Sequence, residues 1–151
     1  MPKGANITFD DTNFQRALRR YIKRAKNLTP IMKGIGIQAS KEIESNFPKQ
    51  RDSKSQSWKP LKKATLAARK KAKKGNKFGP KILMDTGLLR TINFRVKQKS
   101  VLVGTSANYG EPHQFGAPKK HIPKREWLFI DKDGKSKLVK VLKVFFKKGF
   151  R

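Results

Sequence analysis

Cysteine is absent from this 151-residue sequence, which excludes disulfide bridges, thiolate metal sites and a cysteine nucleophile. No apolar run approaches the ~20 residues that a membrane-spanning helix needs, so we expect no membrane partner. Residues 1–6 also lack the apolar stretch of a signal peptide. We therefore expect the protein to be made and used in a cytoplasm.

Acidic residues are scarce as well. The sequence has 10 aspartates and glutamates against 38 lysines and arginines, which gives a formal net charge of +28. Such a charge attracts polyanions in a strongly salt-dependent way, and it opposes close self-packing unless something neutralises it. Nucleic acid or an acidic protein partner would do so, and the charge alone does not choose between them.

Hydrophobic residues make up only 36% of the sequence, and charged residues make up 32%. This composition predicts one modest core within a single domain that spans residues 1–151. We expect residues 1–9 to form a flexible N-terminal arm. Residues 48–81, in which lysine dominates, are expected to be a partly flexible insertion.

Helical spacing of apolar residues predicts three helices in the first half of the chain. The first is expected from Asp10 or Asp11 to about Asn27, with one apolar face made of Phe14, Leu18, Tyr21, Ile22 and Ala25. The second is expected from an N-cap at Thr29, followed by Pro30, to about Phe47, with Ile31, Ile35, Ala39, Ile43 and Phe47 inward. The third runs from Leu61 to Lys74, with Leu61, Ala64 or Thr65, and Ala68 inward.

Turn residues and apolar alternation dominate the second half. Asp85-Thr86 is expected to cap a short helix over residues 88–91, and residues 92–98 and 101–105 predict a β-hairpin. A helical turn then ends at Gly116, and extended segments follow at residues 121–123 and 127–130. We expect a tight turn at residues 131–134 and an amphipathic helix from Lys135 to Lys148, with Leu138, Val141 or Leu142, Phe145 and Phe146 inward.

The sharpest enzyme-like motif is Asp85-Thr86-Gly87. Aspartic proteases of the retroviral kind carry Asp-Thr-Gly after an apolar strand, and two such loops meet so that two carboxylates share one proton. Here Leu88 follows where a small residue is expected, and no second apolar strand ending in Gly-Arg follows. A helix cap at Asp85 explains the same residues, and we therefore predict no catalytic residues.

No metal or cofactor site is predicted. The sequence has two histidines, His113 and His121, and with Glu111 and Glu126 they show no recognised ligand spacing. Residues 131–134 resemble only the start of a calcium loop, which needs further oxygen ligands that are absent here.

The lysine-rich insertion is the candidate contact surface for DNA or for a partner protein. Lysine is a point charge and not a base reader, so any contact with nucleic acid should be independent of sequence. The residues expected to make it are Lys59, Lys62, Lys63, Arg69, Lys70, Lys71, Lys73, Lys74 and Lys77.

A series of short motifs follows in a fixed order: Trp58-Lys59-Pro60-Leu61, Ile82 to Arg90, Val103-Gly104-Thr105, Tyr109, His113 to Gly116, and Ile122 to Arg125. In order and spacing, the series resembles the phage virion morphogenesis family, the tail completion or neck proteins of Mu-like and related contractile-tailed phages. The residues that carry the resemblance are expected to be structural: Trp58, Pro60, Leu61, Asp85, Thr86, Gly87, Leu89, Arg90, Gly104, Thr105, Tyr109, His113, Gln114, Phe115, Gly116, Pro123 and Arg125.

The resemblance implies an α+β fold, with N-terminal helices packed on a small curved antiparallel sheet and a C-terminal amphipathic helix. It also implies a structural, non-enzymatic protein that completes the tail and allows the head to join. The expected partners are further copies of the chain in a hexameric ring, tail tube or terminator proteins, head-connector proteins, and DNA without sequence preference. The expected location is the tail or neck of the virion, after assembly in the host bacterial cytoplasm. The alternatives are a sequence-independent nucleic-acid-binding protein and, third, an aspartic-type protease acting through Asp85.

Overall fold

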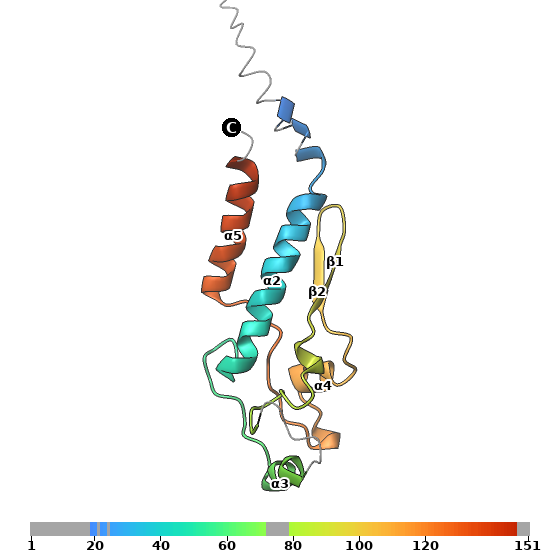
Figure 1. Ribbon diagram of the computed structural model, residues 1–151, viewed down its shortest axis with the longest axis vertical. Helices are drawn as coiled ribbons and strands as arrows, with labels where there is room; N and C mark the ends of the chain where they lie inside the picture. Colours follow the sequence, from blue (N-terminus) through green and yellow to red (C-terminus); the bar gives the residue numbers. More distant parts are fainter. Residues whose placement is uncertain (1–18, 21, 24, 72–78, 148–151) are drawn as a thin grey trace, which may run out of the picture.

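The computed structural model describes residues 19–20, 22–23, 25–71 and 79–147 (Figure 1). The described residues between Arg19 and Lys26 are helical, as predicted. Of the apolar face expected on this first helix, Ile22 is 49% exposed and Ala25 is also exposed. The remaining members of that face, Phe14, Leu18 and Tyr21, lie outside the described residues, as does the predicted arm at 1–9.

The long helix α2, Thr29–Lys49, runs through the middle of the molecule (Figure 1). The expected apolar stripe is confirmed, because Ile31, Ala39, Ile43 and Phe47 are buried and Ile35 is half-buried. Apolar side chains at this spacing form one face of the helix, and that face is turned away from solvent.

Both predicted ends of α2 need correction. Thr29 does not cap the helix through its side chain; instead its N–H donates to Oδ1 of Asn27 at 3.1 Å. Pro48 was expected to end the helix, yet it lies inside the last turn, which closes when the N–H of Gln50 donates to the carbonyl of Asn46 at 3.0 Å. Proline removes one helical hydrogen bond, and here the burial of Phe47 holds the turn in place.

The helix α5, Lys132–Lys147, lies on one side of α2, and a β-hairpin lies on the other (Figure 1). The hairpin consists of β1, Asn93–Val96, and β2, Val101–Gly104, paired antiparallel with Phe94 opposite Val103 and Arg95 opposite Leu102. These helices before and after a two-stranded antiparallel sheet confirm the expected α+β class.

Two glycines of α2 allow this close packing. An added Cβ at Gly36 would overlap the ring of Phe94 in β1, and one at Gly34 would lie 3.2 Å from Cγ1 of Val141 in α5. The two glycines face the hairpin and α5, because these two elements cover opposite sides of α2.

The predicted tight turn at residues 131–134 is wrong. Asp131 stands just before α5, and its Oδ1 accepts the N–H of Gly134 at 2.8 Å, so this short acidic stretch opens the helix. The predicted inward face of α5 is confirmed, with its apolar members half-buried: Leu138, Val141, Leu142, Phe145 and Phe146.

The main core lies beyond the carboxyl end of α2, where loops converge. Phe47 is fully buried, and its ring centroid lies 6.2 Å from that of Trp58 and 5.7 Å from that of Trp127. The other buried members are Ile43, Ile82, Leu83, Met84, Leu89 and Ala107. A core built from separate loops needs polar side chains to fix the backbone between them, and these form the candidate site.

Four short elements surround this core: α3 Lys63–Lys71, η1 Leu88–Arg90, α4 Gly110–Phe115 and η2 Pro118–Lys120. The inward side of α3 was predicted wrongly. Leu66 and Arg69 are half-buried, whereas Ala64, Thr65 and Ala68 are exposed. At the far end of η2, His121 has a positive φ of 53° and ends that turn, where an extended residue was expected.

Candidate functional site

Gln114 of the motif His113 to Gly116 holds the segment 127–130, which was expected to be extended but bends at Leu128, where the N–H of Phe129 donates to the carbonyl of Trp127 at 3.2 Å. Oε1 of Gln114 accepts the N–H of Trp127 at 3.0 Å and that of Leu128 at 2.9 Å. From the opposite direction, Nδ2 of Asn46 donates to the carbonyls of Trp127 and Phe129 at 3.0 and 2.9 Å. The segment therefore belongs to no strand, because side-chain amides supply the hydrogen bonds that a neighbouring strand would give.

Asn46 was not predicted as a site residue. It is 2% exposed and lies on the buried face of α2 beside Phe47. A buried asparagine needs hydrogen-bond partners, and its position next to the apolar stripe was the available signal.

The two tryptophans tie together segments that lie far apart in the sequence. Nε1 of Trp58 donates to the carbonyl of Glu126 at 2.9 Å, and Nε1 of Trp127 donates to the carbonyl of Gly110 at 3.1 Å. An added Cβ at Gly110 would lie 2.9 Å from Cγ2 of Thr105, so only glycine fits between that threonine and Trp127. Each tryptophan thus buries its ring while its N–H is satisfied.

Arg125 connects the last motif to the first. It is 6% exposed, and its guanidinium donates to the carbonyls of Lys59 and Pro60 at 2.9 and 3.2 Å. The backbone N–H of Arg125 donates to the carbonyl of His113 at 2.7 Å. Burial lowers the pKa of Arg125, and the nearby charge of Arg69 lowers it further. This arginine cross-links the chain and is not a free cation.

His113 is half-buried beside this arginine, and its Nδ1 is buried without a hydrogen-bond partner. Burial lowers the pKa of His113, and the charge of Arg125 lowers it further. Both effects favour the neutral imidazole. The ring also lies edge-on to that of Tyr109, with centroids 6.3 Å apart.

Asp85 does not cap η1 as predicted. Its Oδ1 lies 3.4 Å from Nε of Arg69, and its side chain is 59% exposed. The N-cap position belongs to Gly87, whose φ of 80° suits glycine, and Thr86 Oγ1 accepts the N–H of Leu88 at 3.3 Å. A threonine and a glycine are sufficient to close this turn, which leaves Asp85 to pair with α3.

Arg69 was expected to contact DNA or a partner, but the fold engages it. Besides Asp85, its guanidinium contacts the carbonyl of Lys81 at 2.9 Å and that of Gly79 at 3.5 Å. It therefore anchors α3 to the chain that follows the insertion.

The other motif residues mostly serve the fold. Leu89 is 1% exposed in the core, and Leu61 packs against it. Oγ1 of Thr105 accepts the N–H of Ala107 at 3.2 Å, just after Gly104 ends β2. Gly116 has a φ of 86° and an added Cβ there would lie 3.1 Å from the backbone of Lys124. Arg90 is half-buried in η1.

A hollow of ≈ 600 Å³ lies where several motifs meet. Its lining includes the motif residues Leu61, Asp85, Thr86, Tyr109, His113, Pro123 and Arg125. Lys62, Arg69 and Lys120 line it as well. Asp85 is therefore the one acidic side chain among several cationic ones in the described part of its lining. Among the described residues, no three carboxylate or imidazole side chains are grouped so that they would hold a metal ion.

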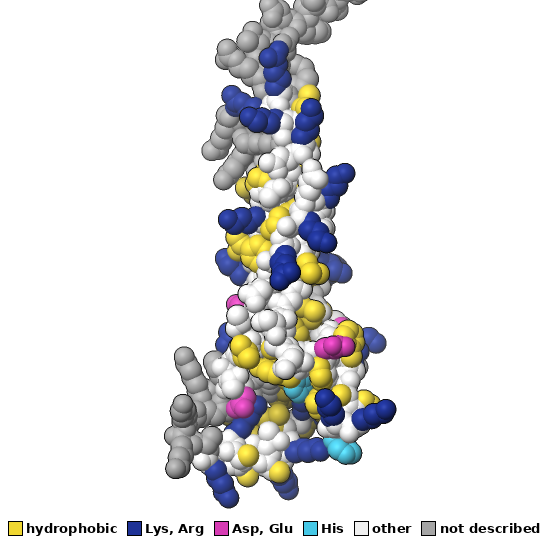
Figure 2. Space-filling model, turned by 90° about the vertical axis from the view of Figure 1, so that its right-hand side faces the viewer, with side chains coloured by type: hydrophobic (Ala, Val, Ile, Leu, Met, Phe, Trp, Pro, Cys, Tyr) yellow, Lys and Arg dark blue, Asp and Glu magenta, His cyan; other side chains and the backbone are white. Residues whose placement is uncertain are grey.

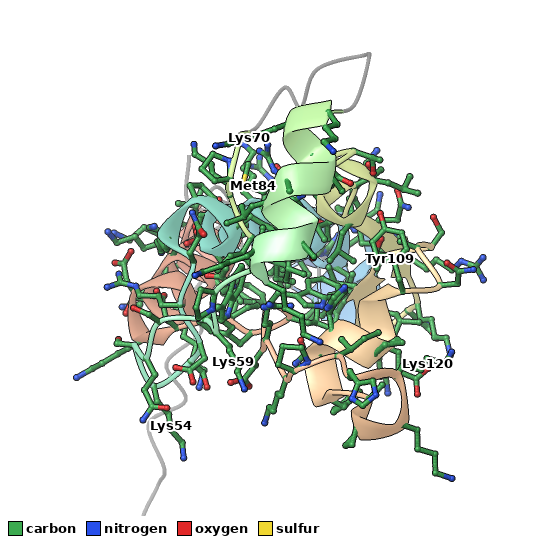
Figure 3. All side chains as sticks on the ribbon, turned by 90° about the horizontal axis from the view of Figure 1, so that it is seen from below. Lys54, Lys59, Lys70, Met84, Tyr109 and Lys120 are labelled. Carbon is green, nitrogen blue, oxygen red and sulfur yellow. The ribbon has the colours of Figure 1, made fainter. Side chains whose placement is uncertain are left out.

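Figure 3 views the molecule from below, from the end that carries α3, and labels two of the predicted contact lysines, Lys59 and Lys70. Those of the predicted contact lysines that lie in the described ranges are exposed: Lys59, Lys62, Lys63, Lys70 and Lys71. Lys73, Lys74 and Lys77 lie outside the described residues. In the part of the chain that the structure covers, no helix has the length and apolar character to cross a bilayer.

Taken together, the motif residues form a scaffold. Their buried polar side chains mostly bind backbone atoms, so these residues serve the fold. Comparison with known families agrees: residues 9–147 match the model of the phage virion morphogenesis family, and the chain belongs to that family. Membership points to a structural, non-enzymatic role. Comparison with the curated proteins and with the solved structures gave no significant match.

Proposed function

We propose that this chain completes the phage tail and allows it to join the head, by assembling as a ring at the end of the tail. The family match over residues 9–147 carries this proposal, because it covers every motif that serves the scaffold. The proposed location is the neck of the virion, after assembly in the host cytoplasm. The proposed partners are further copies of the chain, tail tube or terminator proteins, and head-connector proteins.

The surface supports assembly with other chains. Large hydrophobic side chains remain exposed along the whole length of the molecule: Ile22, Ile37, Leu88, Leu102, Phe115, Val139 and Val144. Figure 2 shows hydrophobic patches between lysines and arginines on the side that carries the hairpin. The two-stranded sheet also has no further strand among the described residues, and an unpaired edge is a site where another chain can pair.

Inactivation of the gene in the phage or prophage that encodes the chain tests the function. We expect filled heads and separate tails in the lysate, and expression of the intact chain from a plasmid should restore joined particles. Normal particles in the absence of the chain would refute the proposal.

Light scattering of the purified chain at low and high salt tests the ring. A single defined multiple of the 17.3 kDa chain that persists at high salt is expected, because apolar contacts resist salt whereas charge contacts are screened. The competing outcome is a monomer at every salt concentration, which would leave no preformed ring.

Sequence-independent binding of nucleic acid is the second candidate, and the net charge of +28 and the exposed lysines favour it. It predicts tight binding to random duplex DNA with a steep decrease as salt rises. If this candidate is correct, a phage whose gene for the chain is inactivated should still make normal particles. Gene inactivation and DNA binding therefore distinguish the two candidates.

We further propose that the chain is not an enzyme. Asp85 is ion-paired with Arg69, and an aspartic protease needs its carboxylate to share a proton with a second one. The substitution Asp85→Asn should therefore leave tail completion intact, with at most about 1 kcal/mol lost in stability from this exposed pair. Loss of particle formation by a well-folded Asp85→Asn chain would support the protease alternative.

A further inference from the structure

Phe115 is the one member of the His113 to Gly116 motif that the fold does not bury. Its side chain is 71% exposed, whereas Gln114 holds the segment at Trp127 and Gly116 adopts the positive φ that ends α4. A single exposed phenylalanine is ordinary, so Phe115 gains meaning only as part of a larger apolar surface with a polar rim, which is typical of an interaction site.

A second hollow, of ≈ 490 Å³, lies beside this ring. Its apolar lining consists of Phe115 together with Pro60, Pro118, Ile122 and Pro123. It adjoins the first hollow, since both are lined by Lys62 and Ile122. The three prolines give the lining little freedom to lose when a ligand binds.

The rim of this hollow is positively charged. Lys59, Lys62 and Lys124 line it and are exposed, and no acidic side chain is among the described residues that do so. Arg125 also lines it, although its guanidinium is engaged by the carbonyls of Lys59 and Pro60. Figure 3 shows this end of the molecule from below, with Lys59 and Lys120 labelled.

We infer that this surface, the Phe115 hollow, docks a short acidic peptide segment that carries an apolar side chain. The apolar side chain would fill the hollow against Phe115, and carboxylates on either side would face Lys59, Lys62 and Lys124. This inference deepens the proposed function by giving the chemistry of the neighbouring protein at the tail end. Only the identification of the neighbour as a tail-end protein rests on the proposed function. The binding of an acidic peptide does not.

A peptide fits the surface better than duplex DNA does. A duplex presents a convex, uniformly charged backbone that would contact the lysines and leave the apolar lining unfilled. An acidic segment with an apolar anchor satisfies both parts of the site. Single-stranded DNA is the closest competitor, because its bases stack on aromatic rings, and it is therefore included in the test.

The test is fluorescence anisotropy of the full chain with a labelled synthetic peptide in which a Leu-Phe pair is flanked by glutamates. Competitors are the same peptide with Ser-Gly in place of Leu-Phe, random duplex DNA and single-stranded DNA. The variants are Phe115→Ser and the pair Lys62→Glu with Lys124→Glu. The matched controls lie on the hairpin: Leu102→Ser, at a side chain that is 67% exposed, and Lys97→Glu with Lys99→Glu. Thermal unfolding of each variant verifies its fold.

We expect the Leu-Phe peptide to bind, with affinity falling about tenfold or more in Phe115→Ser and in the charge-reversed pair. The hairpin controls should stay within about twofold of the unaltered chain. The inference is overturned if the Ser-Gly peptide binds equally well, if single-stranded DNA displaces the peptide more effectively than the unlabelled peptide does, or if Phe115→Ser changes the oligomeric mass and not peptide binding.

Failure of this inference is distinguishable from failure of the proposed function. If the peptide does not bind but inactivation of the gene still gives unjoined heads and tails, only the docking surface is wrong. If the peptide binds as expected but the inactivated phage makes normal particles, only tail completion is wrong.

Discussion

At the scale of single residues, amide side chains fix backbone that no regular element holds. Gln114 and Asn46 approach the segment 127–130 from α4 and α2, and each contributes two short hydrogen bonds. Leaving a buried backbone N–H or carbonyl without such a partner lowers the free energy of unfolding by about 1–3 kcal/mol. The stability of the loop core therefore depends on a few polar side chains as much as on its tryptophans.

Replacement of Gln114 tests this arrangement. Gln114→Ala should destabilise the chain by about 1–3 kcal/mol, because the N–H groups of Trp127 and Leu128 lose their acceptor. Urea unfolding would measure the change. Gln98→Ala, at an exposed position beside the hairpin, is the control and should change stability by less than about 0.5 kcal/mol. Equal effects of the two substitutions would contradict the assigned role.

His113 predicts a dependence of stability on pH. Its pKa is lowered in the folded chain by burial and by Arg125, so the unfolded chain binds a proton near its ordinary pKa of 6.5 when the folded chain does not. The neutral His113 ring thus leaves the free energy of unfolding at its full value above pH 6.5. That free energy decreases as the pH falls through 6.5 toward the lowered pKa of the folded chain.

We therefore expect the free energy of unfolding to fall between about pH 7.5 and 5.5, by no more than about 1.4 kcal/mol per pH unit from this one group. Denaturation at several pH values would measure it. His113→Gln should flatten the dependence, whereas His121→Gln, at an exposed histidine, should leave it unchanged. A steeper dependence in His113→Gln would show that the sign is wrong.

At the scale of elements, α2 is the central support, since the hairpin and α5 pack against it on opposite sides. Periodicity predicted this helix, the hairpin, the helical turn at Gly116 and the inward face of α5. It failed at two aspartates: Asp85 pairs with Arg69 of another element, and Asp131 starts a helix through a local hydrogen bond with the N–H of Gly134. The sequence pattern identified most motif residues, but it could not show that Arg125 and Arg69 are engaged by carbonyls far along the chain.

Alanine substitutions at the two glycines of α2 should differ in their effect on stability. Gly36→Ala should destabilise the chain by about 1–3 kcal/mol, because the new Cβ would lie 2.8 Å from Cγ of Phe94. Gly34→Ala places its Cβ at 3.2 Å from one methyl of Val141, so the gain in helix propensity of about 1 kcal/mol offsets the closer contact. Thermal unfolding of the two variants would measure the difference. A larger loss of stability in Gly34→Ala than in Gly36→Ala would contradict the packing described.

Asp131 predicts a capping contribution to α5. Asp131→Ala should cost about 1 kcal/mol, because the N–H of Gly134 loses its acceptor. This same hydrogen bond lowers the pKa of Asp131, so its contribution is present above its ordinary value of 3.8 and is lost as the pH falls below it. Asp133→Ala removes only an exposed pair with Lys137 and should cost less than about 0.5 kcal/mol. Equal losses in urea unfolding at neutral pH would argue against the cap.

At the scale of the whole molecule, the described chain consists of a loop-built core at one end and thin helical and hairpin layers at the other (Figure 1). The thin end leaves hydrophobic side chains exposed among lysines, as Figure 2 shows. A net charge of +28 opposes the association of identical chains. Salt screens this repulsion for the purified chain, and in our proposal acidic neighbours or DNA neutralise the charge at the junction between tail and head.

Electron microscopy of purified virions labelled with antibody against this chain tests the central claim most directly. The account predicts label concentrated at the junction between head and tail of intact particles, and no label on virions that lack the gene product. Label spread along the tail, or virions that contain none of the chain although they are fully joined, would contradict it.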